Sequence, residues 1–208
     1  MKLIITKILL KNITKKYSMK NKLLIILGTR PEIIKLSSFI KKSEKFFSNI
    51  LVNTNQNYDK NLNKIFFKDL NLKQPKYLLK TNKKHSANQK ISFFISSLER
   101  IIKKEKPDAA LYLGDTNTCY SLIPVKKFKI PIFHLEAGNR CFDERVPEEV
   151  NRRFTDHISD INLVYSTHSK TNLLKEGIHS YRIIKTGSPM MEVIDDNIKK
   201  INNSKILE

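Results

Sequence analysis

Three short apolar runs, each followed at once by a turn or a charged residue, constrain the fold of this chain most strongly. They span residues 23–27, 109–113 and 130–135. Apolar runs of four to eight residues bounded by turn residues are typical of buried strands. Helix-like segments separate these runs along the chain. Strands that alternate with helices predict a parallel sheet with helices on both faces.

The whole pattern predicts an α/β fold with a doubly wound parallel sheet of the Rossmann-like type and right-handed crossovers. Strands are expected at residues 23–27, 49–53, 109–113, 130–135, 161–165 and 183–186. Helices are expected at residues 31–42, 59–70, 87–104, 118–128, 147–159, 169–176 and 189–201. The lysine-rich segment 73–84 is expected to form a mobile loop beside a substrate crevice. No GxGxxG fingerprint is present, which argues against a tight NAD site.

The segment after the first apolar run indicates a tight turn that opens a helix. Gly28 ends the run, and Pro31 fits the first helical turn, where its missing N–H costs nothing. The free backbone N–H groups at such a turn attract phosphate. Arg30 and Lys35 would add positive charge on the same side. This turn is therefore expected to bind an anionic ligand.

Two further strand ends carry acidic residues. Asp115 follows the run 109–113, and Glu136 follows the run 130–135 at the start of a highly charged segment, 134–160. Parallel strands would bring these carboxylates and the basic residues of the first turn into one crevice, where α/β sheets bind ligands. Carboxylates beside guanidinium groups suit an anionic substrate and proton transfers. A charged surface loop is the alternative interpretation.

Length and composition limit the other function classes. A chain of 208 residues forms one good-sized α/β domain, or barely two small ones. The net charge of +19 comes from lysines spread along the whole chain. No nucleic-acid-binding motif is visible, so a specific nucleic-acid partner is not expected. No apolar run approaches the roughly 20 residues of a membrane span. Cys119 and Cys141 form no CxxC pair, which favours a reducing, cytoplasmic location.

Five motifs together resemble the non-hydrolysing UDP-N-acetylglucosamine 2-epimerase family, in the order and spacing of that family. They are GTRPEIIKL (28–36), GDTNT (114–118), HLEAGNR (134–140), PEEVNRR (147–153) and IIKTGSPMMEVI (183–194). The segments NQNYD (55–59) and NRCFDERVPEE (139–149) look more like the branch that acts on UDP-linked diacetamido-uronic acids and N-acetyl-fucosamine precursors. The sequence does not choose among these sugars.

The resemblance implies the N-terminal half of a GT-B-type fold, in which two Rossmann-like domains bind a sugar nucleotide between them. Residues 19–188 would form the N-terminal domain. Residues 189–208 would form the hinge helix and a truncated linker to a second domain, which carries a catalytic histidine in this family. Residues 1–18 are expected to be a disordered extension or a misassigned start, because Met19 stands just before the first strand.

The resemblance also implies an isomerase that inverts carbon-2 of a UDP-sugar by elimination and re-addition of UDP, in cell-surface polysaccharide synthesis. The family's catalytic carboxylates match Asp115, Glu136 and Glu148. Residues implied or considered for substrate binding are Arg30, Lys35, Gln56, His134, Arg140, Arg145 and Arg152. Tyr58 belongs to the same loop as Gln56, and Asn55 stands where the family has glycine. No cofactor and no metal are implied.

Several alternatives stay open at this point. Asp115 could cap the next helix, and Glu148 could favour a helix dipole. His134 could orient Glu136, with which it should share a strand face, or be a core histidine. The expected partners are a UDP-activated N-acetylated sugar, a separately encoded C-terminal domain and a second copy in a homodimer. The competing functions are an inactive fragment that keeps weak nucleotide-sugar binding and a basic polyanion-binding module.

Overall fold

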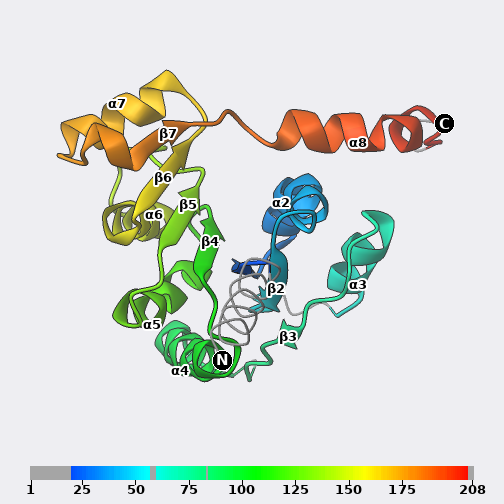
Figure 1. Ribbon diagram of the computed structural model, residues 1–208, viewed down its shortest axis with the longest axis horizontal. Helices are drawn as coiled ribbons and strands as arrows, with labels where there is room; N and C mark the ends of the chain where they lie inside the picture. The colour runs from blue at the N-terminus through cyan, green and yellow to red at the C-terminus, as the bar shows by residue number, and fades with distance from the viewer. Residues whose placement is uncertain (1–19, 57–59, 83, 206–208) are drawn as a thin grey trace, which may run out of the picture.

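A single parallel sheet organises the chain. The computed structural model describes residues 20–56, 60–82 and 84–205, with side chains of α3 from residue 65 onward. Seven strands lie in the order β3-β2-β1-β4-β5-β6-β7, and each neighbouring pair is parallel (Figure 1). The predicted doubly wound α/β fold is therefore confirmed. The predicted extension 1–18 and the loop residue Tyr58 lie outside the described residues.

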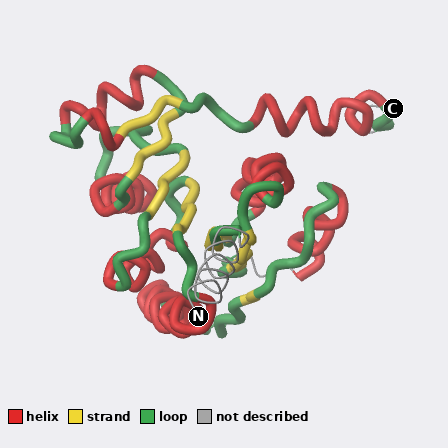
Figure 2. The backbone as a smooth tube through the Cα atoms, viewed as in Figure 1, coloured by secondary structure: helices red, strands yellow, loops and turns green. Residues whose placement is uncertain are grey.

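The strands are β1 (Lys22–Leu27), β2 (Ser48–Asn53), β3 (Tyr77–Leu78), β4 (Ala109–Leu113), β5 (Ile132–Leu135), β6 (Ile161–Val164) and β7 (Ile183–Lys185). The helices are α2 (Arg30–Ser43), α3 (Lys60–Asp69), α4 (Ala87–Glu105), α5 (Leu122–Lys127), α6 (Pro147–Ile158), α7 (Thr167–Lys175) and α8 (Met190–Asn202). Two 3-10 helices, η1 (Asn117–Ser121) and η2 (Ser180–Arg182), complete the described elements. Helices alternate with strands throughout (Figure 2).

The core lies on both faces of the sheet because successive strand residues point in opposite directions. In β1, Leu24 and Ile26 pack with apolar residues of α4 and α5, whereas Ile25 and Leu27 pack with those of α2 and α3. All four are at most 1% exposed. Each such buried side chain stabilises the fold by roughly 1.5–3 kcal/mol. The continuous apolar run that marks β1 in the sequence is thus explained by burial on two faces.

Two segments differ from the sequence-based expectation. The predicted helix 118–128 is divided into η1 and α5, because Pro124 has no N–H to bond the carbonyl four residues earlier. The predicted loop 73–84 contains the short edge strand β3, which pairs with the end of β2. Tyr77 of β3 donates a hydrogen bond of 2.5 Å to the Glu105 carboxylate. A strand of two residues is too short to produce an alternating sequence pattern.

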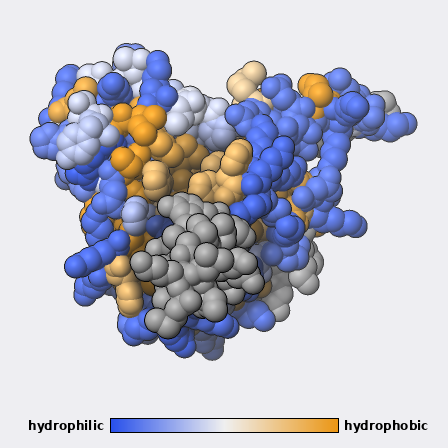
Figure 3. Space-filling model, in the orientation of Figure 1, coloured by the Kyte–Doolittle hydropathy of each residue, from blue (hydrophilic) through white to orange (hydrophobic). Residues whose placement is uncertain are grey.

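The last described helix, α8, packs against α2 and extends beyond it (Figure 1). Val193 is buried, and Glu192 forms an ion pair of 2.7 Å with Lys42. Whether α8 acts as a hinge helix stays a prediction. Most of the surface visible in Figure 3 is hydrophilic, in keeping with the lysine-rich sequence. Among the described residues, no helix is both long and apolar enough to cross a membrane.

Candidate active site

The carboxyl ends of β4 and β5 bring two predicted carboxylates together through one arginine. Arg152, on α6, forms an ion pair with Asp115 after β4. The same guanidinium lies 3.8 Å from the Glu136 carboxylate and donates a 2.6 Å hydrogen bond to the Glu136 carbonyl. Asn151 supports the arrangement with a 2.8 Å hydrogen bond to the Asp115 carbonyl. The side chains of Arg152 and Glu136 are only 9% and 13% exposed, so this pair is weakly screened by solvent.

Lys35 adds a second cation to this group. It lies on α2, and its ammonium is 2.5 Å from the Glu136 carboxylate, although 101 residues separate the two in the chain. The N-terminal half of α2 and the end of β5 therefore meet, as the parallel-sheet argument predicts. Glu136 thus has one cation on each side, Lys35 and Arg152.

The backbone conformation of Glu136 sets the direction of its side chain. Its φ is +71°, in the left-handed region that a non-glycine residue adopts at a cost of about 1–2 kcal/mol. The N–H groups of Glu136 and Ala137 both donate to the Leu163 carbonyl, at 3.1 and 3.3 Å. With Arg152 holding the Glu136 carbonyl, this turn is fixed on two sides. Such local strain is common where a functional side chain must be presented.

A cavity of about 260 Å³ opens beside these groups. Its lining residues are Asp115, Asn139, Arg140, Cys141, Val146, Glu148, Glu149 and Arg152. Glu148 is exposed at the first turn of α6 and forms no hydrogen bond or ion pair with the described residues. Its neighbour Glu149 is buried and accepts hydrogen bonds from the Cys141 N–H and from Arg153. Of the two adjacent glutamates, Glu148 is therefore the one available to a ligand.

The turn between β1 and α2 corrects one expectation. Its N–H groups at Gly28 and Thr29 already donate to the carboxylate of Glu32, so these two are not free as expected, and phosphate binding at this turn stays a prediction. Thr116 donates a 2.7 Å hydrogen bond to the other oxygen of Glu32. Burial raises the pKa of Glu32 to about 7, although these hydrogen bonds oppose the shift. Glu32 therefore ties the first turn to the loop after β4.

Arg30 and Gln56 lie on the same edge of the sheet but contact other groups. Arg30 is exposed, and its guanidinium lies 6.0 Å from the centre of the Phe66 ring. Gln56 donates a hydrogen bond to Thr118. Asn55 has a φ of +54°, which agrees with the expectation that asparagine replaces glycine there. Substrate contacts by Arg30 and Gln56 stay predictions.

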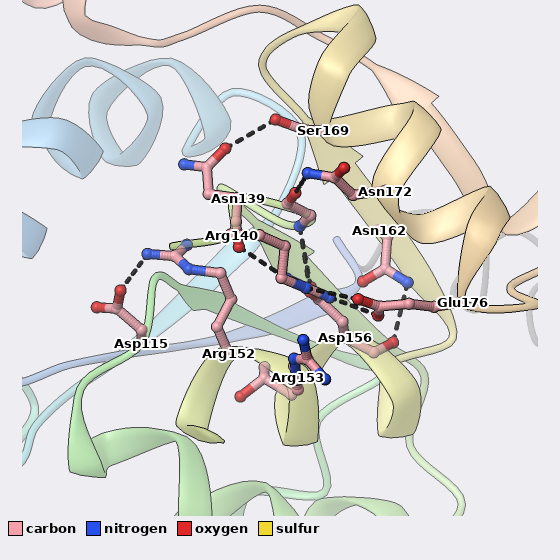
Figure 4. A network of polar contacts seen from close by, with 12 residues as sticks. Asp115, Asn139, Arg140, Arg152, Arg153, Asp156, Asn162, Ser169, Asn172 and Glu176 are labelled. Atoms are coloured by element: carbon pink, nitrogen blue, oxygen red, sulfur yellow. Dashed lines mark hydrogen bonds and ion pairs between the residues drawn. The ribbon is translucent and has the colours of Figure 1, made fainter. Parts of the chain in front are cut away.

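A buried ion network lies behind the cavity (Figure 4). The Arg140 side chain is 0% exposed and contacts Asp156 at 2.8 Å and Glu176 at 2.7 Å. His134 is also 0% exposed, with its ring nitrogens 2.7 Å from Asp156 and 2.8 Å from the Gly114 carbonyl. His134 contacts Asp156 and not Glu136, because Asp156 on α6 reaches the same strand face.

These contacts change the interpretation of three predicted substrate-binding residues. His134 holds β5 to the end of β4 and to α6, whereas Arg140 holds the loop after β5 to α6 and to the end of α7, and neither side chain is exposed to a ligand in this arrangement. Arg145 is 91% exposed and pairs with Asp143, two residues away. Burial raises the pKa of Asp156, but the hydrogen bond from His134 and the charge of Arg140 outweigh it, so the net pKa is below the ordinary value.

A larger hollow of about 820 Å³ lies at the opposite edge of the sheet, near the starts of β6 and β7. Two of its basic residues already have partners: Lys126 pairs with Asp160, and Arg182 donates to the Ser159 carbonyl. No predicted site residue lines it. Nor does the described part of the chain hold a group of three or more His, Cys, Asp or Glu side chains arranged to bind a metal ion.

The fold and site define a Rossmann-like α/β domain with acidic and basic side chains clustered at the carboxyl edge of its parallel sheet. The sequence model that describes the UDP-N-acetylglucosamine 2-epimerase family matches residues 40–208 of this chain. The chain belongs to this family, as the five motifs indicate.

Three relatives show the extent of the similarity. An epimerase structure from Rickettsia bellii is 47% identical with a TM-score of 0.84, and the match covers 90% of this chain and 50% of that one. A Methanocaldococcus jannaschii epimerase in complex with UDP-GlcNAc and UDP is 41% identical with a TM-score of 0.83, over 88% and 51% of the two chains. The UDP-2,3-diacetamido-2,3-dideoxy-D-glucuronate 2-epimerase of Pseudomonas aeruginosa is 36% identical, over 82% and 49%. The chain thus spans about half the length of the curated relatives it matches.

Proposed function

We propose that this chain supplies the catalytic carboxylates of a UDP-sugar 2-epimerase, whose second half binds most of the nucleotide. The proposal is carried by one observation: Asp115, Glu148 and Arg152 line one small cavity, and Arg152 joins Asp115 to Glu136, which also pairs with Lys35. Family membership gives the reaction class, because relatives of the same family bear the name of this activity.

The chemistry needs groups of this kind. A carboxylate removes the proton from carbon-2 while the bond between carbon-1 and the UDP oxygen breaks, which leaves a double bond between the two carbons. UDP then returns to carbon-1, and an acid delivers a proton to the opposite face of carbon-2. Two or more carboxylates with different surroundings can serve as the base and the acid. Cations stabilise the departing diphosphate.

The surroundings of the three carboxylates differ in the required way. Glu136 is 13% exposed between two cations, Asp115 is 25% exposed with Arg152, and Glu148 is exposed without a partner among the described residues. We therefore assign proton transfer at carbon-2 to this set, with Arg152 fixing Asp115 and Glu136. Arg140 and His134 are assigned to holding the site in place.

Substitution within the site tests this proposal. The chain would be assayed with the second half of the Rickettsia bellii relative, with epimer formation followed by NMR. Glu136→Gln, Glu148→Gln and Asp115→Asn should each lower the rate by at least about 100-fold, since each removes a proton-transfer group. Glu144→Gln is the matched control, because Glu144 is 72% exposed and, among the described residues, pairs with Arg153 alone. Equal rates for the control and the Glu136 and Glu148 variants would refute the assignment.

The substrate and the partners of the chain are also part of this proposal. The candidate substrates are UDP-N-acetylglucosamine and a UDP-diacetamido-uronate, the compounds in the names of the Methanocaldococcus and Pseudomonas relatives. A separately supplied C-terminal half, a homodimer and a cytoplasmic location also belong to the proposal. A fragment that binds nucleotide sugars weakly without turnover is the alternative, and the same assay distinguishes it.

A further inference from the structure

Tyr165 lies beside the candidate active site but belongs to none of the five sequence motifs. It follows β6 directly, and β6 pairs with β5 through Leu163 and Leu135, next to Glu136. The ring is partly buried against the apolar cluster between the sheet and α2. Its hydroxyl is buried and makes no hydrogen bond of regular geometry with the described residues, although it interacts with the Glu136 carboxylate. A buried hydroxyl without a partner costs stability and calls for an explanation.

The charged groups that act on this hydroxyl belong to the candidate active site. They are the carboxylate of Glu136 and the guanidinium of Arg152. Burial, then the charge of Glu136 and hydrogen bonding to it, raise the pKa of Tyr165 above its ordinary value, and the charge of Arg152 opposes the shift. The side chain is therefore a neutral phenol throughout the neutral pH range. A neutral phenol both donates and accepts hydrogen bonds.

This property separates Tyr165 from the other two neighbours of Glu136. Lys35 and Arg152 carry only donors, so they stabilise Glu136 only while it is an ionised carboxylate. A group that transfers protons alternates between the carboxylate and the carboxylic acid. The acid has an O–H that neither cation can accept. The phenol oxygen of Tyr165 can accept it, and its O–H can donate to the carboxylate.

We propose that Tyr165 is a positioning residue for the proton transfers of Glu136: it donates to the carboxylate and accepts from the carboxylic acid as the substrate fills the site. The inference rests on the proposed function, because only a Glu136 that exchanges protons needs such a neighbour. It accounts for a hydroxyl that is buried beside Glu136 and yet makes no hydrogen bond of regular geometry in the chain alone.

The test compares Tyr165→Phe with Tyr181→Phe, a control on η2 that is 76% exposed. Both would be assayed with the second half of the Rickettsia bellii relative. Tyr165→Phe should lower kcat about tenfold, the value of one hydrogen bond of about 1.4 kcal/mol, and leave KM within about twofold. A role in substrate binding or packing would change KM or stability instead. Tyr181→Phe should change neither constant.

A second measurement uses the chain alone. Because the hydroxyl makes no hydrogen bond of regular geometry there, Tyr165→Phe should unfold at the same temperature as the wild type or at a higher one. A lower unfolding temperature would show that the hydroxyl is already bonded as a structural element and would overturn the inference. An active wild type with an unchanged kcat in Tyr165→Phe would also overturn it. A wild type inactive on both candidate sugars would instead overturn the proposed function, and the inference with it.

Discussion

Replacing Asp156 by asparagine tests the buried network that supports the site. Asp156 is 0% exposed and accepts from His134 at 2.7 Å, Arg140 at 2.8 Å and the Gly138 N–H at 3.1 Å. An asparagine carries an NH₂ group in place of one carboxylate oxygen, so at least one of these donors would face another donor. It also removes the negative charge that faces the Arg140 guanidinium.

The expected cost follows from these contacts. Removing one partner of a buried ion pair costs about 3–5 kcal/mol, and the lower end applies because Arg140 keeps Glu176. For a chain of this length, about 3 kcal/mol corresponds to a fall of roughly 6–12 °C in the unfolding temperature. Calorimetry on the chain measures it. The matched control, Asp160→Asn, changes an ion pair that is 41% exposed and should cost at most about 1 kcal/mol.

The stability that Asp156 contributes should also depend on pH. The pKa of Asp156 is lowered in the folded chain, so its stabilisation is present above the unfolded pKa of about 3.9 and is lost as the pH falls through the folded value. Asp156→Asn should therefore lose less stability than the wild type in this acid range. Equal unfolding temperatures for Asp156→Asn and Asp160→Asn at pH 7 would refute the reasoning.

Three further predictions concern the site and its supports. Arg152→Gln leaves Asp115 and Glu136 without their shared cation and should lower the free energy of unfolding in urea by about 1–3 kcal/mol, whereas Arg145→Gln, 91% exposed, should cost under about 1 kcal/mol; equal costs would contradict this. Gly28→Ala should lower the unfolding temperature of the chain in calorimetry, since the added methyl group would meet the hydroxyls of Thr54 and Thr118; an unchanged unfolding temperature would contradict this. Because the folded pKa of Glu32, about 7, exceeds its ordinary value of 4.5, wild-type stability should fall as the pH rises between these values, and Glu32→Gln should remove that fall; identical pH profiles would count against it.

The part of the fold predicted correctly is the part that depends on local patterns. The strands β1, β4 and β5 are continuous apolar runs, and such runs indicate burial without any knowledge of partners. The meeting of Lys35 with Glu136 follows from the parallel topology alone. Where local patterns fail, as in the edge strand β3, hydrogen bonding to a distant strand decides the structure.

The details of the site depend on contacts that sequence spacing does not reveal. His134 and Glu136 should share a strand face, but Glu136 leaves the strand with a φ of +71° and the two side chains separate. The Glu32 carboxylate takes the N–H groups that the sequence suggests for phosphate. Tyr165 was missed because it lies outside every motif, although its position at the end of a strand was a usable signal.

The measurement that tests the central claim most directly is deuterium incorporation at carbon-2. The chain would be incubated in heavy water with UDP-N-acetylglucosamine or the UDP-diacetamido-uronate, alone and with the second half of the Rickettsia bellii relative; the intact relative serves as a reference. We expect deuterium at carbon-2 of one sugar when both halves are present, and none when Glu136→Gln replaces the wild-type chain. No incorporation by the combined halves, while the intact relative exchanges, would contradict the account.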